Sequence, residues 1–161
     1  MKRRPLLRGL LAIPFTAACS GAGAQESRSA RTDLVRHTDA EWRERLSPEA
    51  FRVLREHGTE RPFTHRLNTE HRSGTFHCAG CDLALFSSSD KFDSGTGWPS
   101  FTRPASRNVI GETVDRAFGM TRTEVHCDRC EGHMGHVFND GPAPTGLRYC
   151  INGVSLTFRP A

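Results

Sequence analysis

The sequence has no apolar run long enough to cross a bilayer, no long amphipathic helical pattern and no internal repeat apart from a duplicated Cys-x-x-Cys pair. It also lacks net charge once residues 1–24 are set aside. Four of the 22 basic residues lie there, no acidic residue precedes Glu26, and the remaining 18 basic residues balance the 18 acidic ones. This balance, with no basic aromatic stripe, argues against a nucleic-acid partner.

Residues 1–24 predict an export signal, because a basic start is followed by the apolar run 9–18, which is too short to span a membrane. The pair Arg3-Arg4 resembles the twin-arginine pattern, which exports proteins that are already folded. An ordinary secretory signal is the alternative.

Two processing patterns overlap near the end of this signal. Residues 17–19 resemble a lipoprotein box, in which the signal ends at residue 18 and Cys19 carries a lipid, whereas residues 22–24 offer ordinary cleavage after Ala24. We favour lipidation because Cys19 has no other evident role. Residues 25–37 then form a flexible linker and 38–161 one domain. We expect an exported protein, periplasmic or membrane-anchored only through Cys19.

The domain is expected to begin with two short helices. The capping-box pair Thr38 and Glu41 opens the first, and Ser47 followed by Pro48 opens the second, which ends at Gly58 as its C-cap. After that, glycines and prolines divide the chain into short apolar pieces. Strands are expected at 74–77, 83–86, 121–126, 147–151 and 154–158. The sequence therefore predicts a mainly β fold of antiparallel sheets with short N-terminal helices.

Four cysteines form two Cys-x-x-Cys knuckles: Cys78, Cys81, Cys127 and Cys130. Each knuckle can present two thiolates to one ion, and four sulfurs complete the closed tetrahedral shell of structural zinc. We therefore expect one structural Zn²⁺ per chain. Disulfides, a redox motif and an iron–sulfur cluster are the alternatives for cysteines in this pattern.

Cys150 stands apart from both knuckles, in an expected strand. Residues i and i+2 share a strand face, so Arg148, Cys150 and Asn152 should project to one side and offer a cation, a thiol and an amide together. A nearby cation would favour the reactive thiolate. The alternative is an inert cysteine buried in the sheet.

Four runs then carry a resemblance to a known family: residues 58–63 (GTERPF), 92–101 (FDSGTGWPSF), 133–142 (HMGHVFNDGP) and 145–152 (TGLRYCIN). They resemble the B-type peptide-methionine (R)-S-oxide reductases, and the resemblance covers about residues 38–160. It implies a Mss4-like β-tent fold and the reduction of methionine-R-sulfoxide, mainly in proteins, to methionine.

The resemblance also implies residue roles. Cys150 is the nucleophile that becomes a sulfenic acid, and His133 and His136 match the histidines that hold or protonate the sulfoxide oxygen. Trp98 matches the aromatic wall that receives the substrate methyl group, and Phe138 is also assigned to substrate binding. Asp140, Arg148 and Asn152 match polar positions that organise the site. Structural roles for the two histidines and core packing for Trp98 are the alternatives.

Thr96 departs from the family pattern, because many members carry there a cysteine that resolves the sulfenic acid. The other cysteines are four expected zinc ligands and Cys19, so we expect an external thioredoxin-like reductant and a monomeric enzyme. Two other functions remain open: a zinc-knuckle protein-binding module without catalysis, and a thiol hydrolase of Cys-His-Asp type.

Overall fold

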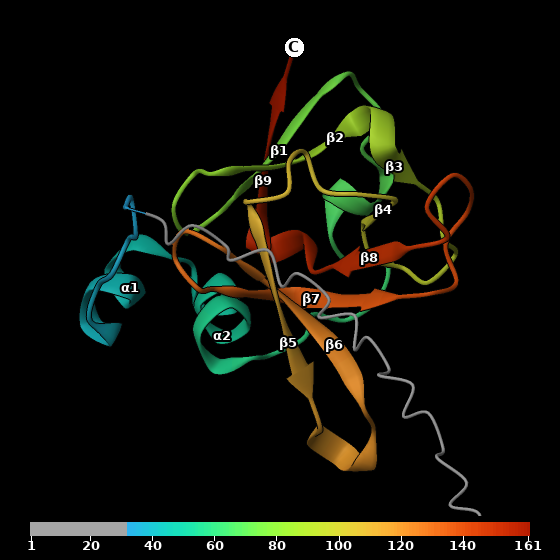
Figure 1. The fold of residues 1–161 in the computed structure, drawn as a ribbon. Coiled ribbons are helices and arrows are strands. Elements are labelled where there is room, and N and C mark those ends of the chain that lie inside the picture. The colour runs from blue at the N-terminus through green and yellow to red at the C-terminus, as the bar shows by residue number, and fades with distance from the viewer. Residues whose placement is uncertain (1–31) are drawn as a thin grey trace, which may run out of the picture.

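The computed structural model describes residues 32–161 and contains two antiparallel sheets. The smaller sheet has the strand order β2-β1-β9, and the larger one has the order β3-β4-β8-β7-β6-β5 (Figure 1). The strands are β1 Gly74–Cys78, β2 Ala84–Ser87, β3 Lys91–Phe92, β4 Ser100–Phe101, β5 Ile110–Asp115, β6 Arg122–Cys127, β7 His133–Phe138, β8 Arg148–Ile151 and β9 Leu156–Pro160. The mainly β, antiparallel fold predicted from the sequence is confirmed.

The predicted export signal, Cys19 and residues 25–31 of the predicted linker lie outside the described residues. The remaining part of the linker range contacts the domain. The Val35 N–H donates to the carbonyl of Arg129 at 2.9 Å, and the Arg129 side chain pairs with Asp33 at 2.9 Å. Within residues 32–161, none of the helices combines the length and the apolar character that a membrane span requires.

The two predicted helices are present as α1 Asp39–Arg45 and α2 Pro48–Glu56. Both halves of the predicted capping box form, and the Ser47 hydroxyl accepts from the second helix. The predicted C-cap is wrong by one residue. His57, not Gly58, takes the left-handed conformation with φ 52°, and it directs its side chain toward Glu124 on β6.

The five predicted strands are present with shifted ends, and four strands were not predicted: β3, β4, β5 and β7. The range 154–158 is only partly a strand, because a 3₁₀ turn, η4 (Gly153–Ser155), precedes β9. Two backbone N–H groups of this turn donate to the buried carboxylate of Glu60, which holds the chain in a turn there. The missed strands are either very short, as in β3 and β4, or contain a glycine, which weakens the β pattern.

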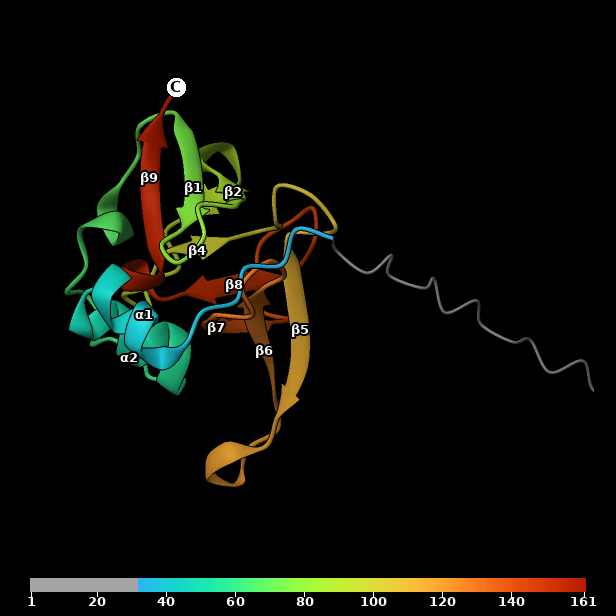
Figure 2. The ribbon, with the colours of Figure 1, turned by 90° about the vertical axis from the view of Figure 1, so that its left-hand side faces the viewer.

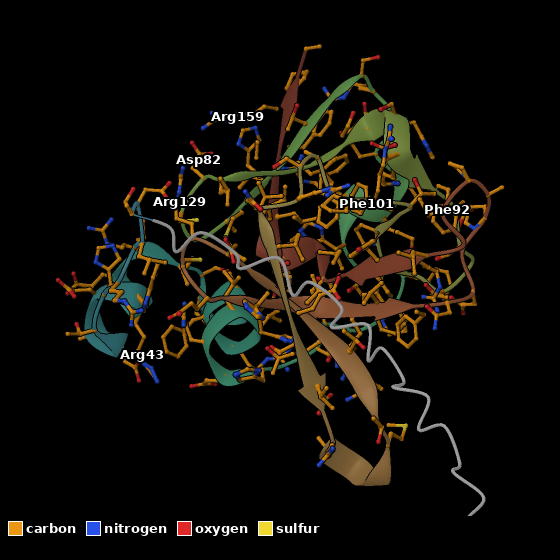
Figure 3. The ribbon with its side chains drawn as sticks, viewed as in Figure 1. Arg43, Asp82, Phe92, Phe101, Arg129 and Arg159 are labelled. Carbon is orange, nitrogen blue, oxygen red and sulfur yellow. The ribbon has the colours of Figure 1, made fainter. Side chains whose placement is uncertain are left out.

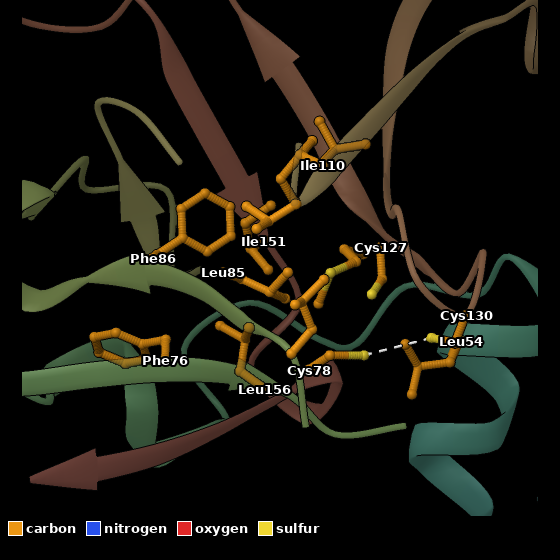
Figure 4. Close-up of a cluster of buried hydrophobic side chains, with 14 of the residues drawn as sticks. Leu54, Phe76, Cys78, Leu85, Phe86, Ile110, Cys127, Cys130, Ile151 and Leu156 are labelled. Atoms are coloured by element: carbon orange, nitrogen blue, oxygen red, sulfur yellow. Dashed lines mark hydrogen bonds between the residues drawn. The ribbon is translucent and has the colours of Figure 1, made fainter. Parts of the chain in front are cut away.

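Aromatic side chains join the two sheets. Phe86 of β2 stacks on Phe101 of β4 with ring centroids 4.3 Å apart, and Phe76 of β1 meets the same ring edge-on at 5.0 Å. All three rings are fully buried. The core therefore lies between the sheets, and Figure 4 shows Phe86 and Ile151 within it, close to the knuckle cysteine Cys127.

The hairpin of β5 and β6 extends away from the rest of the molecule (Figures 1 and 2).

Helix α2 packs against β7 and η4. On the small sheet, Arg159 of β9 pairs with Asp82 of the first knuckle, and both residues are labelled near Arg129 in Figure 3. The first knuckle is thus linked to β9, and the Arg129 side chain of the second knuckle donates to the Cys81 carbonyl at 3.2 Å.

Candidate active site and metal centre

The four knuckle cysteines come together from two parts of the chain that are distant in sequence. Their sulfurs all lie within 4.8 Å of one another, with Cys81 and Cys127 at 3.5 Å. The sulfurs of Cys78 and Cys130 are 3.6 Å apart (Figure 4). Sulfurs bonded to zinc at about 2.3 Å in a tetrahedron are about 3.8 Å apart, whereas a disulfide needs about 2.05 Å. The arrangement fits a metal centre with four sulfur ligands, and none of these cysteines forms a disulfide.

The two knuckles are the same turn built twice. The residue after each second cysteine is left-handed, Asp82 with φ 62° and Glu131 with φ 58°. In each turn its N–H donates to the carbonyl of the first cysteine, at 2.8 Å for Cys78 and 2.9 Å for Cys127. Hydrogen bonding to Cys127 and the neighbouring sulfurs, together with burial, raises the pKa of the Cys78 thiol well above its ordinary value. Four thiolates within 4.8 Å of one another repel, so a cation is needed for all four sulfurs to ionise together.

Cys150 lies on β8 and lines a separate cavity of about 160 Å³. The cavity is formed by Thr59, Trp98, Arg122, Gly135, His136, Phe138, Cys150 and Asn152. Five of these residues were predicted as site residues from the sequence: Trp98, His136, Phe138, Cys150 and Asn152. His133, Asp140 and Arg148, also predicted, lie around the cavity rather than in its lining.

Strand register places the reactive side chains on one face of the large sheet. His136 of β7 is directly opposite Cys150 of β8 and also opposite Glu124 of β6. Arg122 is two residues before Glu124 and opposite Asp115 of β5. Opposite residues, and residues two apart on a strand, share a face, so these five side chains form a row across four strands.

The two histidines occupy different environments. A register shift between Val125 and His126 lets His133 and His136 approach on the same side, with ring centroids 5.6 Å apart. His133 is almost fully buried, its Nδ1 donates to Glu124 at 2.7 Å, and burial lowers its pKa. His136 lines the cavity, and its Nε2 donates to Asp115 at 2.8 Å.

Arg148 and Asp140 form a bidentate ion pair with two hydrogen bonds of 2.8 Å. The guanidinium also lies 4.4 Å from the centre of the Phe138 ring, which is part of the cavity wall. Burial raises the pKa of the Cys150 thiol, and the positive charge of Arg148 opposes that effect. Thr96 approaches from another side, with its hydroxyl oxygen 4.0 Å from the Cys150 sulfur.

Asn152 follows β8 rather than lying within it, and its side chain is committed to backbone contacts. It accepts from the N–H of Glu60 at 2.9 Å and donates to the carbonyl of Met134 at 2.9 Å. The Trp98 indole donates to the Glu60 carbonyl at 3.2 Å. Glu60 thus ties two walls of the cavity together. It lies in the quoted run 58–63, but that run gave no sign of this role.

Residues of the β5–β6 hairpin were not recognised as site residues from the sequence. Arg122 lines the cavity, Asp115 holds His136, and Glu124 holds His133. The available signal was the set of charged residues in the expected strand 121–126. A charged side chain on a partly buried strand face needs a polar partner, so these residues could have been expected to contact other site residues. Gly135 was quoted only as part of a run. A Cβ there would collide with the Cys150 carbonyl oxygen, so glycine allows β7 to approach β8 at the reactive cysteine.

Comparison with known proteins identifies the family of this chain. A family model described as "SelR domain" matches residues 46–160. "Peptide methionine sulfoxide reductase MsrB" of Pseudomonas putida (strain W619) is 59% identical over 120 residues, which cover 74% of this chain and 90% of that protein. The protein of the same name from Thiobacillus denitrificans is 58% identical over 123 residues, covering 76% and 93%. The chain belongs to the SelR-domain family, the family of the B-type methionine sulfoxide reductases.

Proposed function

We propose that this protein reduces methionine-R-sulfoxide, mainly in oxidised proteins, to methionine. The observation that carries the proposal is that Cys150, His136 and Trp98 line one cavity. That cavity offers a nucleophilic thiol, a proton donor and an aromatic wall to a single substrate group. The family relationship supports the same reaction.

The reaction transfers oxygen from the substrate sulfur to Cys150. The thiol passes its proton to His136, and the resulting thiolate attacks the sulfoxide sulfur. The attack forms an S–S bond, and the imidazolium gives the proton to the sulfoxide oxygen. That oxygen then bonds to the Cys150 sulfur as the S–O and S–S bonds to the substrate sulfur break. The substrate sulfur gains two electrons and the Cys150 sulfur loses two, so the products are methionine and a sulfenic acid.

The remaining cavity residues bind and orient the substrate. Trp98 and Phe138 provide apolar surfaces for its methyl group. Arg148 favours the thiolate by its charge and is held by Asp140. Asn152 and Glu60 hold the wall that carries Trp98. His133 stays on Glu124, and its burial supports the proposal that His136 donates the proton.

An external thiol completes the cycle. Thr96 occupies the place beside Cys150 from which a second thiol would form a disulfide. A thioredoxin-like reductant therefore attacks the sulfenic acid, releasing water and forming a mixed disulfide. A second thiol then restores Cys150 and leaves the reductant oxidised. The enzyme is proposed to act as a monomer.

The four knuckle cysteines are proposed to hold one structural zinc ion. Four sulfurs leave no open position for substrate, so the metal would supply stability rather than chemistry. The distances between the sulfurs support this ligand set. The ion would join the end of β1 to the end of β6 and thereby connect the two sheets.

We also propose export through residues 1–24, with a lipid on Cys19. Replacing Cys19 by Ala should abolish lipid labelling and release the protein from membranes. Replacing Arg3 and Arg4 by lysines should block export by the twin-arginine route. Unchanged membrane fractionation of Cys19→Ala would instead support cleavage after Ala24.

The stereospecific assay tests the function directly. The purified domain is incubated with dithiothreitol and each epimer of a methionine-sulfoxide peptide, and methionine is measured. Wild type should reduce the R epimer only, and Cys150→Ser should reduce neither. Activity on neither epimer by wild type, or hydrolysis of the peptide, would contradict the proposal.

A further inference from the structure

We infer that Asp115 is a positioning residue of the reductase step: it holds His136 by Nε2 and leaves Nδ1 to exchange the proton with the sulfoxide oxygen. The inference rests on the proposed function and deepens it, because it adds to the site a carboxylate that does not line the cavity.

The contacts of Asp115 are specific to each oxygen. Oδ2 accepts from His136 Nε2 at 2.8 Å and from Arg122 Nη2 at 2.6 Å. Oδ1 accepts from the Ala117 N–H at 2.8 Å, at the start of the hairpin turn. One oxygen is therefore anchored to the backbone, and the other is aimed at the histidine.

The register of the sheet makes this contact possible. Asp115 is the last residue of β5 and His136 belongs to β7, so the carboxylate reaches past β6 to a strand that is not its neighbour. Arg122 lies opposite Asp115, on the same face as His136. The arginine balances the charge of the carboxylate while the carboxylate contacts the ring.

A carboxylate on one ring nitrogen has two chemical consequences. It selects the tautomer with hydrogen on Nε2, so that Nδ1 accepts the proton from Cys150, and it stabilises the imidazolium that forms. During the reduction, this imidazolium then gives the same proton to the sulfoxide oxygen. The Ala117 N–H, followed by His136 and Arg122, lowers the pKa of Asp115, so it stays ionised when the histidine is charged.

Other charged groups also surround His136. They are Arg122 and Glu124 on β6, His133 on its own strand, and Cys150 and Arg148 on β8. Glu124 is shared by His57 at 3.1 Å and His133 at 2.7 Å. Asp115 is the carboxylate in hydrogen-bond contact with the histidine that lines the cavity.

The test uses Asp115→Asn, which keeps an oxygen for the Ala117 N–H and removes the charge. Single-turnover reduction of the R-sulfoxide peptide should slow by about 10- to 100-fold, a part of the roughly 10²–10⁴ that a general acid contributes. KM should change less than about twofold, because Asp115 does not line the cavity. The pH dependence of the rate should also change, because the ring loses the carboxylate that contacts Nε2.

Glu112→Gln, on the same strand, is the matched control and should leave rate and profile unchanged. Asp115→Glu should restore part of the rate. A folded Asp115→Asn protein with wild-type rate and profile would overturn the inference. Failure of the proposed function is distinct, because wild type itself would then lack R-specific activity.

A measurement on wild type keeps the test independent of activity and of variant folding. Nitrogen-15 NMR of His136 in the zinc-loaded protein should show hydrogen on Nε2 in the neutral ring. A neutral ring with hydrogen on Nδ1 would overturn the inference.

Discussion

The four knuckle cysteines and Cys150 are the same residue type in opposite settings. The knuckle sulfurs lie within 4.8 Å of one another in two matched turns, so each thiolate would be bound by a shared cation. Cys150 faces a cavity beside Arg148, His136 and Thr96, and the lining of that cavity includes no second cysteine. The comparison teaches that the partners of a cysteine, rather than its burial, separate a structural thiol from a reactive one.

The largest effect is expected when the metal centre is broken. Cys127→Ser should lose zinc and unfold, since structural zinc contributes about 10–16 kcal/mol of apparent binding energy and a domain has only about 5–15 kcal/mol of stability. Zinc content and circular dichroism during a thermal melt measure both. A folded, metal-free Cys127→Ser protein would remove the structural half of the comparison.

Cys150→Ser should have the opposite pattern. Turnover of the R-sulfoxide should fall below detection because serine is not a nucleophile at neutral pH without strong activation. Zinc content should match wild type, and the melting temperature should change by only about 2 °C, since one sulfur is exchanged for oxygen at a half-buried position. Retained turnover would mean that another cysteine carries the reaction.

Thr96→Cys should make the surroundings of Cys150 more like those of the knuckle cysteines, because it places a second sulfur beside Cys150. Without reductant, wild type should form about one methionine per chain and keep a sulfenic acid that dimedone labels. The variant should instead form a disulfide between the new cysteine and Cys150, because the Thr96 hydroxyl oxygen of the wild type lies 4.0 Å from the Cys150 sulfur. Peptide mass spectrometry distinguishes the two products. A disulfide from Cys150 to a knuckle cysteine in wild type would contradict the separation of roles.

The smallest effect concerns the charge beside Cys150. Burial raises the pKa of this thiol and the Arg148 cation opposes the rise, so Arg148→Met should raise it further. The thiolate then forms at higher pH, and alkylation by iodoacetamide at pH 7 should slow by less than about tenfold. The negative charge of Asp140 raises the pKa of the Cys150 thiol, so Asp140→Asn should lower that pKa and speed alkylation. Equal rates in all three proteins would show that neither charge tunes the thiol.

Local patterns predicted much of the framework. The Thr38 and Ser47 caps form hydrogen bonds within three residues, so a short stretch of sequence contains both partners. The knuckles have the same property, because one Cys-x-x-Cys turn presents two sulfurs. The end of α2 was misjudged at Gly58 because His57, which faces Glu124 on a distant strand, takes the left-handed position.

The sequence by itself determined the candidate residues: two pairs of cysteines with metal-ligand spacing, a lone cysteine, and histidines and aromatics in recognisable runs. Only the tertiary structure decided which of them act together. The bulge beside Val125 brings two histidines to one side, and burial separates His133 from His136. The contact of Asp115 with His136 depends on the register of three strands, so no local pattern contains it. Because one shift in register turns a side chain to the other face, such contacts are set by the packing of the whole sheet.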